Sequence, residues 1–140
     1  MSASPNRDTS PFEAASYWLP PLCLCILIFM ISARPAPEAM PGFRFADKLL
    51  HAIVYCSLSI LLLRAFLLGG LSIRLRLAAL AAFCVASLYG VSDEIHQYFI
   101  PSRTASVGDA LADILGAAMG TIAMWIILGR VRRFEQSIGS

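Results

Sequence analysis

Four long apolar stretches run along the chain, separated by short polar segments. They cover Pro11–Ala33, Asp47–Leu68, Leu75–Phe99 and Ala105–Gly129. Each is long enough for a transmembrane helix, which needs about 20 mostly apolar residues. Because the connections are short, consecutive helices are expected to run antiparallel. The pattern predicts an all-α membrane protein in which residues 1–140 form one domain, an up-down bundle of four transmembrane helices.

Local signals mark the ends of the first helix. Ser10 precedes Pro11, and Glu13 follows three residues after the Ser, the arrangement of a capping box with proline at the first helical position. Pro20 and Pro21 fall inside the stretch and predict a kink. The segment 34–46 contains three prolines and a glycine, so it is expected to be an extended loop.

Composition narrows the class further. Hydrophobic residues make up 58% of the chain and charged residues 14%, against about 45–50% and about 25% in a typical soluble domain. This excludes a disordered tail, a basic nucleic-acid-binding domain and a disulfide-rich secreted module. We expect the lipid bilayer as the surroundings, no nucleic-acid partner and no cofactor. The first 16 residues lack a basic excess, so the first helix is expected to be retained rather than cleaved as a signal peptide.

The distribution of Lys and Arg predicts the orientation. With both termini inside, seven of these residues lie on the inner side: Arg7, Arg64, Arg74, Arg76, Arg130, Arg132 and Arg133. Four lie on the outer side: Arg34, Arg44, Lys48 and Arg103. Positive residues favour the cytoplasmic side of a membrane. We therefore predict that both termini are cytoplasmic, which a periplasmically active C-terminal alkaline phosphatase fusion would contradict.

In this topology the unusual polar residues gather at the outer ends of the second, third and fourth helices. This set, called the rim cluster below, consists of Asp47, Lys48, His51, Tyr55, Glu94, Gln97, Arg103, Asp109 and Asp113. Asp47, His51 and Tyr55 recur every four residues and share one face of a helix. A carboxylate at mid-bilayer costs at least about 2.5–3.5 kcal/mol. The carboxylates are therefore expected to face inward, with Lys48, Arg103 and His51 as the available cations.

A plainer interpretation treats these charges as ordinary helix-end residues. Asp47 would then be an N-cap, and Asp109 would favour the positive end of a helix dipole. This explains Glu94 and Asp113 less well, because Glu94 lies at the C-terminal end of its helix and Asp113 lies well inside its span. Asp93 and His96 are assigned to a different face and expected to be solvated.

Arg103 lies in the tight connection between the third and fourth helices. Its planar guanidinium presents five donors, so it is expected to bridge Glu94 and Asp109, or one carboxylate and an anionic ligand. A metal site from His51, His96 and Glu94 is conceivable, but their spacing fits no zinc template, so no metal is expected.

Small residues recur at four-residue spacing on the fourth helix: Gly108, Ala112, Gly116 and Gly120. Such a stripe lets another helix approach closely. The partner is either a helix of the same bundle or a second copy of the chain.

Two motifs resemble signatures of the VanZ-like family of integral membrane proteins. The first is Asp47-Lys48-x-x-His51-x-x-x-Tyr55, and the second is Glu94-x-x-Gln97-x-x-x-Pro101-x-Arg103-Thr104-Ala105-Ser106-x-x-Asp109. The resemblance covers roughly residues 17–129. Ser102 stands where the family usually has Gly, and Asp113 where it often has Asn. The family is named for teicoplanin resistance, so the resemblance implies a multi-pass protein of the bacterial cytoplasmic (inner) membrane in a cell-envelope or antibiotic-resistance context.

Three functions remain open from the sequence. In the first, the rim cluster binds an envelope-related anionic or lipid-linked ligand, such as a lipid-linked sugar phosphate or a glycopeptide-like molecule, with Lys48 and Arg103 supplying positive charge. In the second, the protein is a non-catalytic accessory subunit of a larger membrane complex and the cluster is structural. In the third, it is a lipid-phosphate hydrolase or transferase with His51 as general base, although no nucleophile motif is present.

Overall fold

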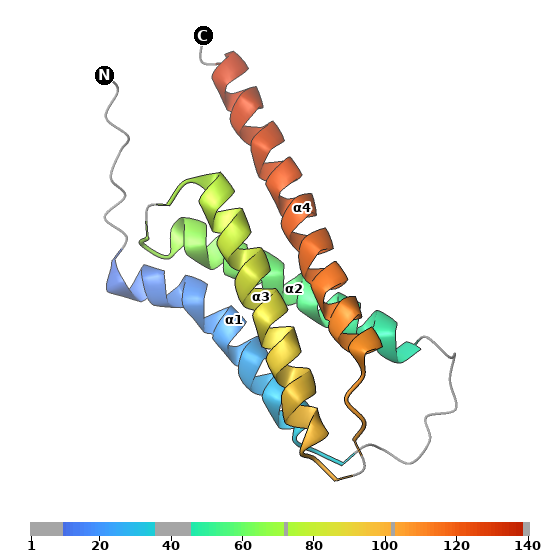
Figure 1. The fold of residues 1–140 in the computed structure, drawn as a ribbon. Helices are drawn as coiled ribbons and strands as arrows, with labels where there is room; N and C mark the ends of the chain where they lie inside the picture. The colour runs from blue at the N-terminus through green and yellow to red at the C-terminus, as the bar shows by residue number, and fades with distance from the viewer. Residues whose placement is uncertain (1–9, 36–45, 72, 102, 139–140) are drawn as a thin grey trace.

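The computed structural model describes residues 10–35, 46–71, 73–101 and 103–138, except the side chain of Arg132. These residues form four helices in the order α1 (Pro11–Ser32), α2 (Ala46–Leu68), α3 (Leu75–Tyr98) and α4 (Val107–Ile138). All four are long and apolar enough to cross a membrane. Figure 1 shows that successive helices run in opposite directions, so the start of α1 and the end of α4 lie at the same end of the bundle. The predicted all-α membrane fold is thus confirmed, whereas its orientation in the membrane stays a prediction.

The start of α1 has the predicted capping box. Ser10 Oγ accepts a hydrogen bond from the backbone N–H of Glu13 at 3.2 Å, and Glu13 Oε2 accepts one from the N–H of Ser10 at 3.1 Å. Pro20 and Pro21 lie inside the helix, and Figure 1 shows α1 changing direction along its length.

The fourth helix is longer than its predicted membrane span. α4 continues past Gly129 and the arginines after it to Ile138, and this last part projects beyond the other helices (Figure 1). Arg133 Nε donates to the carbonyl of Gly129 at 3.2 Å, one turn earlier. Gly129 is therefore an interior helix residue. The charged and helix-favouring residues after it continue the helix outside the packed part of the bundle.

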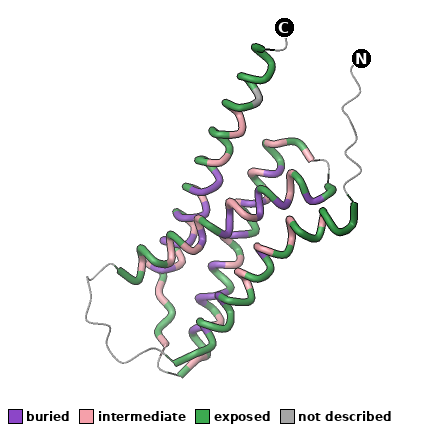
Figure 2. Tube along the Cα trace, turned by 180° about the vertical axis from the view of Figure 1, so that it is seen from behind, coloured by how far each residue is buried: buried purple, intermediate pink, exposed green. Residues whose placement is uncertain are grey.

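The core lies where α2 meets the other helices. α2 packs against α1, α3 and α4. Ala78, Ala82 and Ala86 repeat every four residues on α3 and are fully buried, which brings α3 close to Leu58 and Leu62 of α2. Figure 2 shows the buried residues along the inner faces and exposed residues along the outside of the bundle. Most of the large apolar side chains face outward, as expected for a bundle solvated by lipid rather than water.

Glycine contacts join α4 to α2. A Cβ added at Gly116 would overlap the backbone carbonyl of Ala52, and one added at Gly120 would overlap the carbonyl of Cys56. Ala112 is buried in the same stripe, while Gly108 faces the side chain of Lys48 instead of a helix backbone. The structure thus places the small-residue stripe inside the bundle.

Replacing Gly116 tests this contact. Gly116→Leu should separate α4 from α2 and lower the free energy of unfolding by at least about 1–3 kcal/mol, because the added side chain meets backbone that cannot move aside. Gly129→Leu is the matched control, since an added Cβ there has no atom within 4 Å. Thermal unfolding in detergent would measure both. Equal melting temperatures for the two variants would show that the α2–α4 contact is not as close as described.

Candidate functional site

The rim cluster occupies the end of the bundle where α1 and α3 finish and α2 and α4 begin. Five of its members are buried: Tyr55, Glu94, Gln97, Asp109 and Asp113. Lys48, His51 and Arg103 are half-buried, and Asp47 is exposed at the start of α2. The structure therefore brings side chains from three helices and one connection to one end of the molecule. It divides them into separate sets of contacts.

One set joins α2, α3 and α4 through His51. His51 Nδ1 lies 2.9 Å from Asp113 Oδ1, a hydrogen bond in which the imidazole N–H donates to the carboxylate. Glu94 Oε1 lies 3.9 Å from the same nitrogen. Asp113 is completely buried, with 0% exposure. Its charge thus faces an imidazole and a second carboxylate, away from lipid.

Gly90 makes room for Asp113 on α3. A Cβ added at Gly90 would lie 2.7 Å from Asp113 Cβ and 3.0 Å from its Oδ2. In the sequence, Gly90 lies one turn before Glu94 on the same face of the helix. That spacing gives no sign that Gly90 makes room for a carboxylate from α4.

A second set joins α2 to the start of α4. Lys48 Nζ lies 2.6 Å from Asp109 Oδ1 and 3.5 Å from Ser106 Oγ. Gly108 allows this approach, since an added Cβ would lie 2.8 Å from Lys48 Nζ. Lys48 is therefore engaged within the bundle.

Glu94 forms a hydrogen bond with the backbone just before the next helix. Its Oε2 accepts a hydrogen bond from the backbone N–H of Ser106 at 2.8 Å, directly before α4 begins at Val107. A carboxylate is favourable beside the positive N-terminal end of a helix. This explains why an acidic residue is placed at the C-terminal end of α3, where it opposes the dipole of its own helix.

Arg103 does not make the expected bridge between Glu94 and Asp109. Its Nε donates to the carbonyl of Arg34 and its Nη2 to the carbonyl of Ile31, both at 3.0 Å. Ile31 lies in the last turn of α1, and Arg34 follows the helix. The α3–α4 connection passes the end of α1, so Arg103 adds side-chain donors to these two carbonyls, and the carboxylates are paired by Lys48 and His51.

The expectation that Asp93 and His96 are solvated is wrong. Asp93 is 6% exposed and accepts a hydrogen bond from Gln97 Nε2 at 3.0 Å. Gln97 Nε2 also lies 3.4 Å from Ser32 Oγ of α1. The imidazole of His96 stacks on Phe29, with ring centroids 4.8 Å apart. Asp93 and Gln97 are four residues apart, so they share the face that α1 covers.

A cavity of about 180 Å³ lies between α1, α2 and α3 beside these groups. Its polar lining consists of Ser32, Asp47, His51, Tyr55, Asp93, Gln97 and Arg103. Apolar side chains, among them Ile28, Leu50 and Val54, line the rest. Tyr55 is 1% exposed, and its hydroxyl has no hydrogen-bond partner among the described residues. The cavity thus combines an apolar wall with a polar wall that keeps unused hydrogen-bonding capacity.

Comparison with known proteins gives one result. The VanZ/LLP1 family matches residues 17–128, a range that contains the whole rim cluster. Neither the curated proteins nor the solved structures provide a significant match.

Substituting Arg103 tests its role at the end of α1. Arg103→Ala should lower the free energy of unfolding by about 1–3 kcal/mol, because two carbonyls lose charged donors. The free energy of unfolding of Arg103→Lys should lie between those of Arg103→Ala and the wild type, because one ammonium group cannot make both hydrogen bonds with the geometry of the planar guanidinium. Arg130→Ala, at an exposed position on α4, is the control. Thermal unfolding in detergent measures all three. Wild-type stability for both Arg103 variants would contradict the contacts described.

Proposed function

The chain belongs to the VanZ/LLP1 family, and on this premise we propose that its rim cluster binds the headgroup of an envelope-related, lipid-linked ligand at the outer surface of the bacterial cytoplasmic membrane. The observation that carries the proposal is the cavity of about 180 Å³ with one apolar and one polar wall. Ligand sites typically combine apolar walls with a few polar groups that fix orientation. An amphiphilic ligand can place its apolar part against the apolar wall and its polar headgroup against the polar wall.

The position of the cavity supports a ligand that arrives from the bilayer. Leu50 and Ile31 line it and are 59% and 52% exposed on the apolar outside of the bundle. A lipid chain can therefore lie against these side chains while its headgroup reaches the polar wall. The volume is below the roughly 300–1,000 Å³ of a site for a drug-sized molecule. A whole glycopeptide would be too large to enter, so a single sugar or phosphate headgroup is the better fit.

The charges of the lining favour a headgroup with both acidic and hydroxyl groups. Arg103 lines the cavity, and the bonds to α1 use only its Nε and Nη2. The guanidinium thus retains donors for a phosphate. Asp47 and Asp93 can accept hydrogen bonds from sugar hydroxyls. Lys48, expected to contribute charge as well, does not line the cavity and pairs with Asp109.

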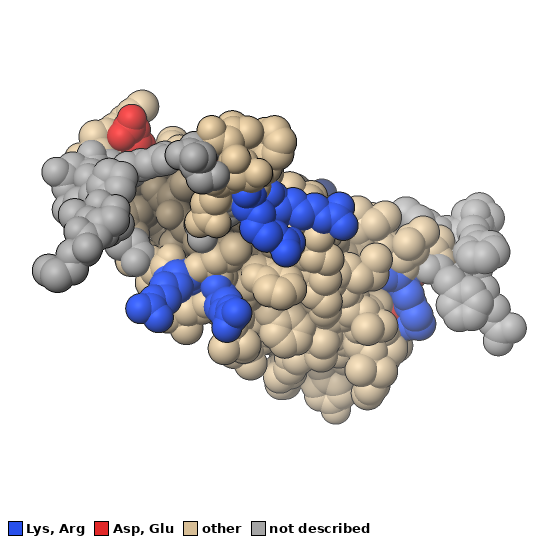
Figure 3. Space-filling model, turned by 90° about the horizontal axis from the view of Figure 1, so that it is seen from above, with Lys and Arg blue, Asp and Glu red and all other residues tan. Residues whose placement is uncertain are grey.

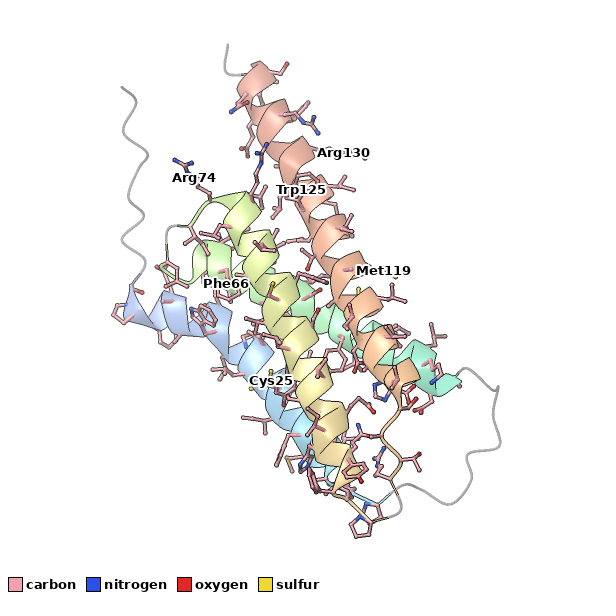
Figure 4. All side chains as sticks on the ribbon, viewed as in Figure 1. Cys25, Phe66, Arg74, Met119, Trp125 and Arg130 are labelled. Carbon is pink, nitrogen blue, oxygen red and sulfur yellow. The ribbon has the colours of Figure 1, made fainter. Side chains whose placement is uncertain are left out.

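The positive charge at the opposite end of the bundle supports an outward orientation of the rim cluster. Figure 3 shows Lys and Arg side chains spread over the face seen from that end. Figure 4 places Arg74 and Arg130 there, at the start of α3 and beyond Trp125 on α4. By the positive-inside rule this basic end is cytoplasmic. The rim cluster then faces the cell envelope.

A structural role is the second candidate. Lys48, His51 and Arg103 are all engaged by groups of the chain itself, as in a network that only locks helices together. The protein would then act as an accessory subunit of a larger membrane complex. For the hydrolase or transferase alternative, the structure adds only that His51 lines the cavity.

Narrowing the cavity separates these candidates. The probe is a photoactivatable polyprenyl phosphate in proteoliposomes, with crosslinks mapped by mass spectrometry. Val54→Phe should reduce labelling of the cavity-lining residues by about tenfold, which corresponds to about 1.4 kcal/mol of binding free energy. Leu80→Phe is the matched control, because Leu80 lines a different cavity between α3 and α4.

A second comparison tests whether Arg103 contacts the phosphate of the ligand. Arg103→Gln should weaken labelling by the polyprenyl phosphate more than labelling by the uncharged polyprenol. Equal labelling of the wild type and Val54→Phe would contradict ligand binding in this cavity and favour the structural role.

A further inference from the structure

His51, Glu94 and Asp113 come from three different helices and bring their donor atoms together in the interior. One nitrogen and two carboxylate oxygens lie within 4.8 Å of one another. We infer that this triad binds a divalent transition-metal ion of the zinc type. The site lies between α2, α3 and α4, and the proposed headgroup cavity lies between α1, α2 and α3. The two proposed sites share His51, but neither proposal is used as evidence for the other.

The distances fit such an ion. His51 Nδ1 is 2.9 Å from Asp113 Oδ1 and 3.9 Å from Glu94 Oε1. Zinc binds nitrogen and oxygen at about 2.0–2.2 Å, so two donors of a tetrahedral site lie about 3.4 Å apart. The two observed separations lie on either side of this value. The third separation, between a Glu94 oxygen and an Asp113 oxygen, is within 4.8 Å.

An unpartnered oxygen provides the second, independent observation. Glu94 Oε1, which lies 3.9 Å from His51 Nδ1, is buried and has no hydrogen-bond partner in the part of the chain that the structure describes. Glu94 is 6% exposed. Leaving a buried carboxylate oxygen without a partner is costly. A cation between the carboxylates and His51 would remove this cost.

The charge of the site suits a divalent ion. Two carboxylates carry two negative charges, and a divalent ion bound to the neutral imidazole neutralises both. Three protein ligands of this type leave a fourth position open, as in catalytic zinc sites. Glu94 also lines a cleft of about 380 Å³ between α3 and the start of α4.

The site was not expected from the sequence because the wrong third ligand was considered. His96, the candidate there, stacks on Phe29 of α1. Asp113, from the next helix, takes the place beside His51. The spacing of ligands spread over three helices matches no local zinc motif.

Metal binding to the purified protein tests the inference. The full chain, stripped with a chelator in detergent, would be titrated with Co²⁺, followed by its visible absorption, and with Zn²⁺ by calorimetry. One ion should bind per chain, and Co²⁺ should show the strong absorption of a tetrahedral site. Glu94→Gln and Asp113→Asn should each weaken binding by about 100-fold or more, since each replaces an anionic ligand by a neutral amide, and even changes to groups around the ligands cost about 10–100-fold.

Glu135→Gln is the control, because Glu135 is an exposed carboxylate of α4 outside the triad and outside the rim cluster. It should bind the ion as the wild type does. Size-exclusion profiles establish whether each variant is folded. If Asp113→Asn does not fold, Glu94→Gln still tests the inference, because its amide oxygen retains an acceptor for the N–H of Ser106. The inference fails if the wild type shows no saturable binding, or if Glu94→Gln binds as tightly as Glu135→Gln. Because no lipid is needed, such a failure would leave the proposed headgroup binding unaffected.

Discussion

The structure depends on keeping the carboxylate of Asp113 away from lipid. A charge at this depth is costly, and Asp113 is nevertheless completely buried. Two features make this arrangement stable. His51 of α2 hydrogen-bonds the carboxylate, and Gly90 of α3 leaves the space that it occupies. The position of one side chain on α4 therefore constrains how α2 and α3 lie against it.

The other charges at this end of the bundle connect helix ends. Glu94, at the end of α3, accepts the N–H of Ser106 before α4 begins. Arg103, between α3 and α4, donates to the carbonyls of Ile31 and Arg34 at the end of α1. Lys48, at the start of α2, pairs with Asp109 in the first turn of α4. The end of α1 and the beginnings of α2 and α4 are thus tied to neighbouring elements by charged side chains.

Most of the fold could be predicted from the sequence, because hydrophobic length is a strong signal for membrane helices. The capping box at Ser10 and the rim cluster could also be recognised, since four-residue spacing places side chains on one face. The pairing within the cluster could not. Arg103 was assigned to the carboxylates because opposite charges attract, but the end of α1 lies nearer, and that proximity is a property of the tertiary fold.

Asp93 was missed for a different reason. Its four-residue spacing to Gln97 was present in the sequence, but whether that face meets lipid, water or α1 depends on how α1 packs. The same limit applied to Gly90, whose role is visible only when Asp113 lies opposite it. Spacing along a helix shows which residues share a face of that helix. Which faces of different helices contact one another depends on how the helices pack in the bundle.

The most direct test of this account is a double-mutant cycle on the free energy of unfolding in detergent, with His51→Gln, Asp113→Asn and the double variant. If the two side chains hold α2 and α4 together, the double variant should be more stable than the sum of the single effects implies. The coupling energy should be about 1–3 kcal/mol. Effects that add to within about 0.5 kcal/mol would contradict the claim that this pair organises the bundle.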